Sequence, residues 1–275
     1  MTRARFHVSG WVATVFSLFL TGLSAHAAVP GQEDLIDQLE IGGTGRVNDV
    51  IDGDTILLEN GRQIRLVGIQ APKLPLGRKN VTAWPLAAEA RQTLENLVLG
   101  RQVTYAFGGS QEDRHGRLLG HLFLDDGAWV QGEMLRAGLA RVYSFADNRA
   151  LAADMLALET AARDDRRGIW ALAFYQVRDP IEAARHINGF ELVAGRVLDA
   201  AVVRGRAYLN FGTNWRDDFT ISLAPAVTKR FEDEGIDIIG TYRNKKVRVR
   251  GWLESFNGPM IEATHSEQIE ILPEN

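Results

Sequence analysis

The feature that most constrains the fold of this chain is a change of periodicity at Gly45. From there, apolar and polar residues alternate with a period of two, the pattern of a strand with one buried face. Asn60-Gly61 separates two such runs and predicts a β-hairpin with a type I′ turn, because both residues tolerate a positive φ. Further strands are predicted at residues 103–107 and 118–124. Short strands joined by turns therefore dominate this part of the chain.

Three segments among and after these strands have helical spacing. In residues 84–99 the apolar side chains of Leu86, Ala90 and Leu94 fall on one face, and Gly100 ends the helix. Two more helices are predicted at 130–137 and 150–163. Five short strands with packed helices are typical of a small closed barrel, because closure leaves no exposed sheet edge. The predicted fold class is therefore mainly β with α (α+β).

Residues 1–28 have the features of a secretory signal peptide. Arg3 and Arg5 precede a mostly apolar stretch, and Ala25-His26-Ala27 supplies small residues at the two positions that a signal peptidase recognises. The stretch is shorter than the roughly 20 residues that a membrane anchor needs, and the absence of charge after Arg5 disfavours an amphipathic surface helix. We therefore expect export to the periplasm or the medium, with no stable membrane span after processing.

Composition excludes several functional classes. The chain has no cysteine, which removes disulfide scaffolds, thiolate metal sites and a cysteine nucleophile. Lys and Arg number 31 against 35 Asp and Glu, a net charge of -4, so any attraction to phosphate must come from local clusters. The six histidines show no metal-ligand spacing, and neither a phosphate-cradling Gly-x-x-x-x-Gly-Lys nor a Gly-x-Ser-x-Gly string occurs.

Five short strings occur in the order found in staphylococcal-nuclease-like domains. They are Ile51-Asp52-Gly53-Asp54-Thr55, Arg65-Leu66 followed by Pro72, Asp113-Arg114-His115-Gly116-Arg117, Gly138-Leu139-Ala140 and Gly168-Ile169-Trp170. Their shared order is specific, so residues 42–172 resemble a staphylococcal nuclease (thermonuclease)-like domain. The resemblance implies an OB-fold five-stranded barrel with three helices and, in active members, calcium-dependent cleavage of DNA and RNA.

The resemblance also assigns roles to particular residues. It makes Asp54 the first calcium-ligating carboxylate, with Asp52 in the same turn, and Arg65 and Arg117 the two phosphate-gripping groups. A hard cation prefers carboxylate oxygens, and the planar fork of arginine donates two parallel hydrogen bonds to a phosphate. The structural alternative for Arg65 is an outward-facing strand residue paired with Glu59 or another carboxylate on the hairpin.

The sequence departs from the family pattern at residues 70–73. Active members carry Asp-Thr-Pro-Glu there, whereas this chain has Gln70-Ala71-Pro72-Lys73. Gln70 offers a neutral oxygen in place of a metal-ligating carboxylate, so the metal site of Asp54, Asp52 and Gln70 is weakened. Lys73 stands at the general-base position, where an ammonium accepts no proton from water and repels a bound cation. Loss of a general base alone costs about 100- to 10,000-fold in rate.

Three functions remain open at this point. The favoured one is an exported protein that binds nucleic acid, or another phosphate-bearing ligand, with weak or lost phosphodiesterase activity and no cofactor. The second is an active calcium-dependent DNA/RNA endonuclease. A related possibility is cleavage without calcium, in which the charge of Lys73 takes the place of the metal and Asp52 or Asp54 acts on the attacking water. The third is an envelope scaffold that binds other proteins.

A linker at residues 173–188 precedes a second unit at 189–275. Arg178-Asp179-Pro180 ends the preceding helix, and residues 181–187 predict a short connecting helix. Strands predicted at 192–198, 206–211, 219–223, 247–253 and 260–271, with a hairpin turn at Asn257-Gly258, indicate a second small OB-like β-barrel. Its interleaved arginines and aromatics form either a stacking platform for single strands or a core with a solvated outer face.

Overall fold

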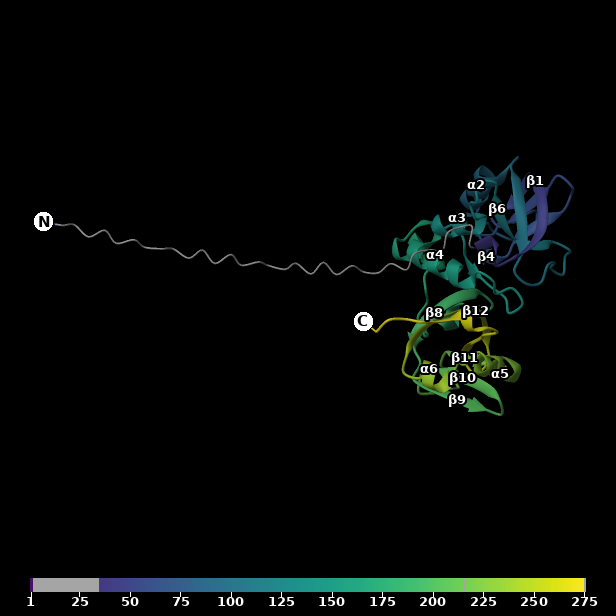
Figure 1. Ribbon diagram of the computed structural model, residues 1–275. Helices are drawn as coiled ribbons and strands as arrows, with labels where there is room; N and C mark the ends of the chain where they lie inside the picture. Colours follow the sequence, from purple (N-terminus) through teal and green to yellow (C-terminus); the bar gives the residue numbers. More distant parts are fainter. Residues whose placement is uncertain (2–34, 215, 275) are drawn as a thin grey trace.

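The computed structural model describes residue 1, residues 35–214 and residues 216–274. The predicted signal peptide lies outside the described residues. Within them, no helix combines the length and the apolar character needed to cross a bilayer. Two units follow one another along the chain, with the helical segment around α4 (Ala152–Asp164) and the strands β8 (Phe190–Arg196) and β12 (Lys246–Ser255) close to the boundary between them (Figure 1).

The N-terminal unit is the predicted five-stranded barrel. Its strands are β1 (Glu40–Asp52), β2 (Thr55–Leu58), β3 (Gln63–Leu66), β5 (Gln102–Phe107) and β6 (Leu118–Leu124). They close in the order β1-β2-β3-β6-β5, and only the β3–β6 pair is parallel. The long strand β1 closes the barrel, because its first half pairs with β5 and its second half with β2.

Three helices pack against this barrel near their predicted positions. They are α2 (Ala87–Val98), α3 (Val130–Arg136) and α4. Their buried faces join the inward side chains of the strands in one apolar core, in which Ile64, Leu94 and Met155 are fully buried. A separate two-stranded sheet of β4 (Gly68–Gln70) and β7 (Arg141–Tyr143) lies beside the barrel.

The hairpin at Asn60-Gly61 is present, but its turn is not the type I′ turn that we predicted. Gly61 has φ 80, whereas Asn60 is absent from the described non-glycine residues with positive φ. Gly61 N–H donates to the Leu58 carbonyl, so one more residue belongs to the loop and only its last position is left-handed. At the second Asn-Gly pair both Asn257 (φ 51) and Gly258 (φ 93) are left-handed, as a type I′ turn requires.

The C-terminal unit is a β unit as expected, but the second barrel that we predicted is not formed, because among the described strands only those of the N-terminal unit close into a barrel. Its sheet runs in the order β14-β12-β13-β11-β10-β9, and β8 pairs with β12. Among the described strands β9 pairs only with β10 and so forms an edge. The elements not yet given are β9 (Asp199–Val203), β10 (Arg206–Asn210), β11 (Thr220–Leu223), α5 (Pro225–Asp233), α6 (Ile238–Tyr242), β13 (Pro259–Glu262) and β14 (Ile269–Ile271).

The segment between the units is packed rather than free. Short 3-10 helices form at Gly168–Ala171, Ala173–Tyr175 and Glu182–Arg185. The backbone of Arg178 pairs with β8, donating to the Leu192 carbonyl and accepting from Ala194 N–H. An apolar cluster that includes Trp170, Tyr175 and Phe190 then joins the end of the first unit to β8.

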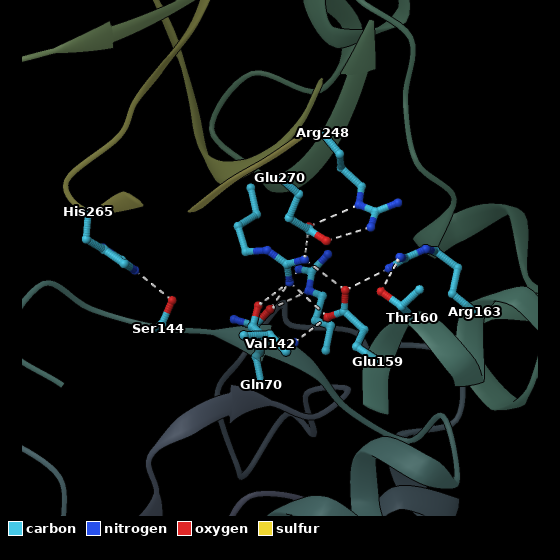
Figure 2. Close-up of polar contacts among 11 residues, drawn as sticks. Gln70, Val142, Ser144, Glu159, Thr160, Arg163, Arg248, His265 and Glu270 are labelled. Atoms are coloured by element: carbon cyan, nitrogen blue, oxygen red, sulfur yellow. Dashed lines mark hydrogen bonds and ion pairs between the residues drawn. The ribbon is translucent and has the colours of Figure 1, made fainter. Parts of the chain in front are cut away.

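A buried ion cluster also crosses the boundary. Glu159 on α4 accepts hydrogen bonds from Nη1 and Nη2 of Arg250 on β12, each at 2.9 Å. It also accepts a hydrogen bond from Arg163 Nη1 at 2.8 Å. Figure 2 shows Glu159 facing Glu270 and Arg248 of the C-terminal unit across this boundary. Burial alone would raise the pKa of Glu159, but Arg250 outweighs it and the net shift is downward. The two units are therefore connected through charges that have little access to water.

Candidate functional site

Asp54 lies in the tight connection between β1 and β2, at the centre of the predicted site. Asp52 Oδ1 accepts the Asp54 N–H at 3.1 Å and so fixes the turn. Gly53 is required between them, because a Cβ there would meet the Cβ atoms of Ala71 at 2.7 Å and Ala90 at 2.8 Å. The chain thus passes so close to α2 that the Asp54 side chain is fully buried.

The buried carboxylate of Asp54 is surrounded by donors. Its Oδ2 lies 2.7 Å from Lys73 Nζ, 2.8 Å from Ala71 N and 3.2 Å from Arg65 Nη2. Its Oδ1 accepts the Thr55 hydroxyl at 3.3 Å. The structure therefore brings Asp54, Arg65 and Lys73 together, and Lys73 forms an ion pair with the carboxylate assigned to the metal.

The pKa shifts in this cluster follow from burial and from these neighbours. Burial alone would raise the pKa of Asp54, but the charges of Arg65 and Lys73 outweigh it and lower the pKa to about 2. Burial, followed by the charge of Asp54, raises the pKa of Asp52. Burial lowers the pKa of Lys73, against the opposing effect of Asp54. Asp54 is thus ionised at neutral pH and is neutralised by side chains of the protein itself.

Gln70 faces away from this cluster. Its Oε1 accepts two hydrogen bonds from Arg141, from Nε at 3.0 Å and from Nη2 at 2.7 Å. Gln70 is labelled in Figure 2, where it lies beside Val142 at the boundary between the units. The three residues predicted as metal ligands are therefore divided, with Asp52 and Asp54 in one place and the Gln70 amide bonded elsewhere.

The residues present do not fit a calcium ion. Calcium takes six to eight oxygen ligands, several of them carboxylates. In the described part of the chain, no group of three or more Asp, Glu, His or Cys side chains is placed to hold a metal. Asp54 Oδ2 is already paired with the ammonium of Lys73, and a second cation beside it would be repelled.

Arg65 on β3 holds the protein backbone as well as Asp54. Its Nη1 donates to the carbonyls of Leu66 at 2.6 Å and Asp54 at 3.2 Å, and its Nη2 donates to Ile69 at 2.6 Å. Its side chain is 12% exposed. The alternative pairing with Glu59 is not formed, because Glu59 faces Arg46 at 3.5 Å. Arg65 therefore fixes the connection from β3 to β4 and presents only an edge to solvent.

Arg117 lies at the end of the loop between β5 and β6. Asp113 organises this loop by accepting the backbone N–H groups of His115 and Arg117, and its Oδ2 accepts Arg117 Nε at 2.8 Å. Arg114, in the same loop, is exposed and has no carboxylate partner among the described residues. Arg114 Nε donates to His115 Nε2 at 3.2 Å, so the loop offers one guanidinium without a carboxylate partner in the described residues beside one that Asp113 holds in position.

Arg65 and Arg117 line the same cleft, which has a volume of about 660 Å³. Its lining also includes Arg114 and His115, the aromatic side chains of Tyr143, Phe145 and Trp252, and the carboxylates of Glu112, Asp113 and Asp147. From the sequence, Arg114 is recognised only as part of one of the five ordered strings, and neither Tyr143 nor Trp252 is assigned to the site. Arg114 could have been found from its position between Asp113 and Arg117. Trp252 could not, because it belongs to the C-terminal unit.

Comparison with known proteins agrees with this architecture. Residues 63–172 match the family model described as "Staphylococcal nuclease homologue". A protein of Escherichia coli O157:H7 named "Uncharacterized endonuclease" is 35% identical over 130 residues, which are 46% of this chain and 76% of that protein. This chain belongs to the staphylococcal nuclease family. The family resemblance and the OB-like barrel predicted from the sequence are therefore confirmed.

Other relatives share the nuclease domain within longer proteins. The "Probable staphylococcal-like nuclease CAN1" of Oryza sativa subsp. japonica is 34% identical over 43% of this chain and 31% of its own length. "Endonuclease YhcR" of Bacillus subtilis (strain 168) is 30% identical over 46% of this chain and 11% of its own length. The staphylococcal nuclease family therefore accounts for the N-terminal unit, and the structure of the C-terminal unit must be interpreted from its own residues.

Proposed function

We propose that this member of the staphylococcal nuclease family binds single-stranded nucleic acid through the cleft of Arg65, Arg114 and Arg117, with weak or lost phosphodiesterase activity. The observation that carries the proposal is the ion pair between Lys73 Nζ and Asp54 Oδ2 at 2.7 Å. Lys73 thus neutralises the carboxylate that the family resemblance assigns to the metal, and it stands at the position that the resemblance assigns to the general base. Asp54, which is fully buried, also has no free face toward solvent.

The basic side of the cleft supports binding. Arg114 carries a guanidinium without a carboxylate partner in the described residues, and Asp113 holds Arg117 at the same rim. Arginine donates paired hydrogen bonds to phosphate and keeps its charge at any working pH. The net charge of the chain is -4, so such binding depends on this local cluster rather than on the overall field.

A second candidate is hydrolysis without a metal, and the ion pair between Lys73 and Asp54 favours it. Protonated Lys73 would supply the positive charge that a bound ion provides in metal-dependent chemistry, and Asp52 or Asp54 would act on the attacking water. Cleavage would then survive a chelator, whereas a calcium enzyme would lose activity.

The test combines binding and cleavage on one end-labelled single-stranded DNA. Binding is measured against salt concentration for the wild type, for Arg114→Ala and for the control Arg204→Ala, which changes an exposed arginine in the C-terminal unit. Each phosphate contact contributes about 0.7 to the slope of log affinity against log salt for single strands. We expect Arg114→Ala to reduce the slope by about that amount and Arg204→Ala to leave it unchanged.

Cleavage of the same DNA is followed with calcium and with a chelator, with Arg117→Ala as the control for contaminating nuclease. Salt-dependent binding without cleavage in either buffer supports the proposal. Cleavage that survives the chelator and is lost in Arg117→Ala supports the second candidate. Calcium-dependent cleavage that is lost in Arg117→Ala, or the absence of any salt-dependent binding, contradicts the proposal.

Export is part of the same proposal. It rests on the composition of residues 1–28, where two arginines precede an apolar stretch and a small-residue cleavage site. Expression of the full chain, followed by N-terminal sequencing of the mature protein from the periplasm or the medium, tests it. A product that retains Met1 in the cytosol contradicts export.

A further inference from the structure

We propose that the C-terminal unit completes the cleft with an aromatic subsite for an unpaired nucleic-acid base, whose exposed ring is that of Trp252. The inference rests on the proposed function and deepens it, because it selects single-stranded over double-stranded ligands. It also gives the C-terminal unit, which lies outside the matched residues 63–172, a direct part in ligand binding.

Trp252 is held at the cleft by a contact between the two units. It lies on β12, and its indole Nε1 donates to the Tyr143 hydroxyl of β7 at 3.0 Å, across 109 residues of sequence. The indole N–H is its only polar group, and this bond satisfies it. Trp252 remains 51% exposed. The ring is therefore fixed at its polar end while much of its apolar surface stays open.

Other aromatic rings pack against Trp252 and against one another. Phe190 packs against it with ring centroids 6.5 Å apart, and Tyr143 packs edge-on to Phe190 at 4.6 Å and to Phe145 at 4.9 Å. Phe190 is buried, whereas Phe145 is 48% exposed beside the same cleft. The cluster is thus anchored in the protein on one side and open on the other, which is the arrangement of a stacking platform.

The neighbouring charges indicate what this platform binds. Trp252 lines the same cleft as Arg65, Arg114 and Arg117. Of the carboxylates in this lining, Glu112 is paired with Arg62, Asp113 with Arg117, and Asp147 accepts the Ser110 hydroxyl. A nucleotide carries a phosphate and a flat base, which match the guanidinium groups and the aromatic face of this cleft. A base within a duplex has its faces covered by its neighbours, so only an unpaired base can stack on Trp252. The cleft volume of about 660 Å³ is in the range of small-ligand sites.

The test uses two fluorescein-labelled oligonucleotides of equal length, an oligo-dT and an abasic strand with the same phosphates. Loss of one base–aromatic stack costs about 5- to 150-fold in affinity. We expect Trp252→Ala to weaken oligo-dT binding by about this factor and to leave binding of the abasic strand unchanged. Trp252→Phe retains an aromatic face and should recover most of the affinity.

Phe256→Ala is the matched control, because Phe256 is a 62% exposed aromatic at the end of the same β-hairpin and lines a different cavity. It should change neither affinity, and the unfolding midpoint of each variant shows that the fold is intact. Equal weakening of both oligonucleotides by Trp252→Ala, or no weakening of oligo-dT, overturns the base subsite and leaves the proposed function standing. A wild-type protein that binds neither oligonucleotide overturns both.

Discussion

Glu159→Gln is the perturbation that most directly probes how the two units are joined. The glutamate is fully buried, and its two oxygens accept four hydrogen bonds, two from Arg250, one from Arg163 and one from the Val142 N–H. Glutamine has almost the same shape, but it carries no charge and one of its two positions is a donor. Whichever way the amide is turned, its NH₂ group faces two donors that previously met an oxygen.

The expected cost follows from this geometry. Removing one partner of a buried ion pair costs about 3 to 5 kcal/mol, because the other charge is left uncompensated. Arg250 keeps Glu270 as a partner at 2.6 Å, so the loss should lie at the lower end, about 3 kcal/mol. The matched control is Glu262→Gln. Glu262 accepts Arg206 at 2.6 Å, but both side chains are about a third or more exposed, and such surface pairs contribute less than about 1 kcal/mol.

The assay is urea unfolding of the full chain, followed by tryptophan fluorescence and by circular dichroism. We expect Glu159→Gln to lower the free energy of unfolding by about 3 kcal/mol, with a much smaller change for Glu262→Gln. If the two variants lose the same small amount, the Glu159–Arg250 pair does not hold the units together and the reasoning is refuted. Two separate unfolding transitions, or transitions that differ between fluorescence and circular dichroism, would show instead that the units unfold separately.

Two further predictions concern the Asp54 cluster. The pKa of Asp54 is lowered to about 2 from 3.8, so its stabilising effect is present above pH 3.8 and is lost as the pH falls through 2. We therefore expect the difference in unfolding free energy between wild type and Asp54→Asn to shrink by about 2 kcal/mol between about pH 5 and 2. Urea titrations at several pH values measure it, and a difference that is constant with pH would contradict the prediction. Lys73→Glu replaces the ammonium beside Asp54 with a carboxylate. We expect this variant to bind calcium, measured by calorimetry, and to cleave DNA with calcium at least about 100-fold faster than wild type. The control Lys73→Gln removes the cation without adding a carboxylate and should gain neither property. Calcium binding by wild type equal to that of Lys73→Glu would contradict the prediction.

Much of the N-terminal unit could be predicted because the residues that determine its strands and helices are close together in the sequence. The alternation around Asn60-Gly61 and the helical spacing before Gly100 depend on neighbouring residues, and the corresponding strands and α2 lie close to the predicted ranges. The turn type at Asn60 was wrong, because the number of loop residues is decided by how β2 and β3 register within the barrel. In the C-terminal unit, α5, α6 and β9 were missed, since each is only nine residues long or shorter and leaves little room for a period to be recognised.

The sequence by itself determined the family, the barrel and the departure from the family pattern at Lys73. Only the tertiary structure decided that Lys73 pairs with Asp54, that Gln70 bonds Arg141 and that Trp252 lines the same cleft as the arginines. Arg250 meets Glu159 across 91 residues of sequence, and Trp252 meets Tyr143 across 109. Sequence patterns report which face of a strand or helix is buried, because burial repeats with the local geometry. Which distant side chain lies opposite depends on how complete units pack, and no local pattern records it.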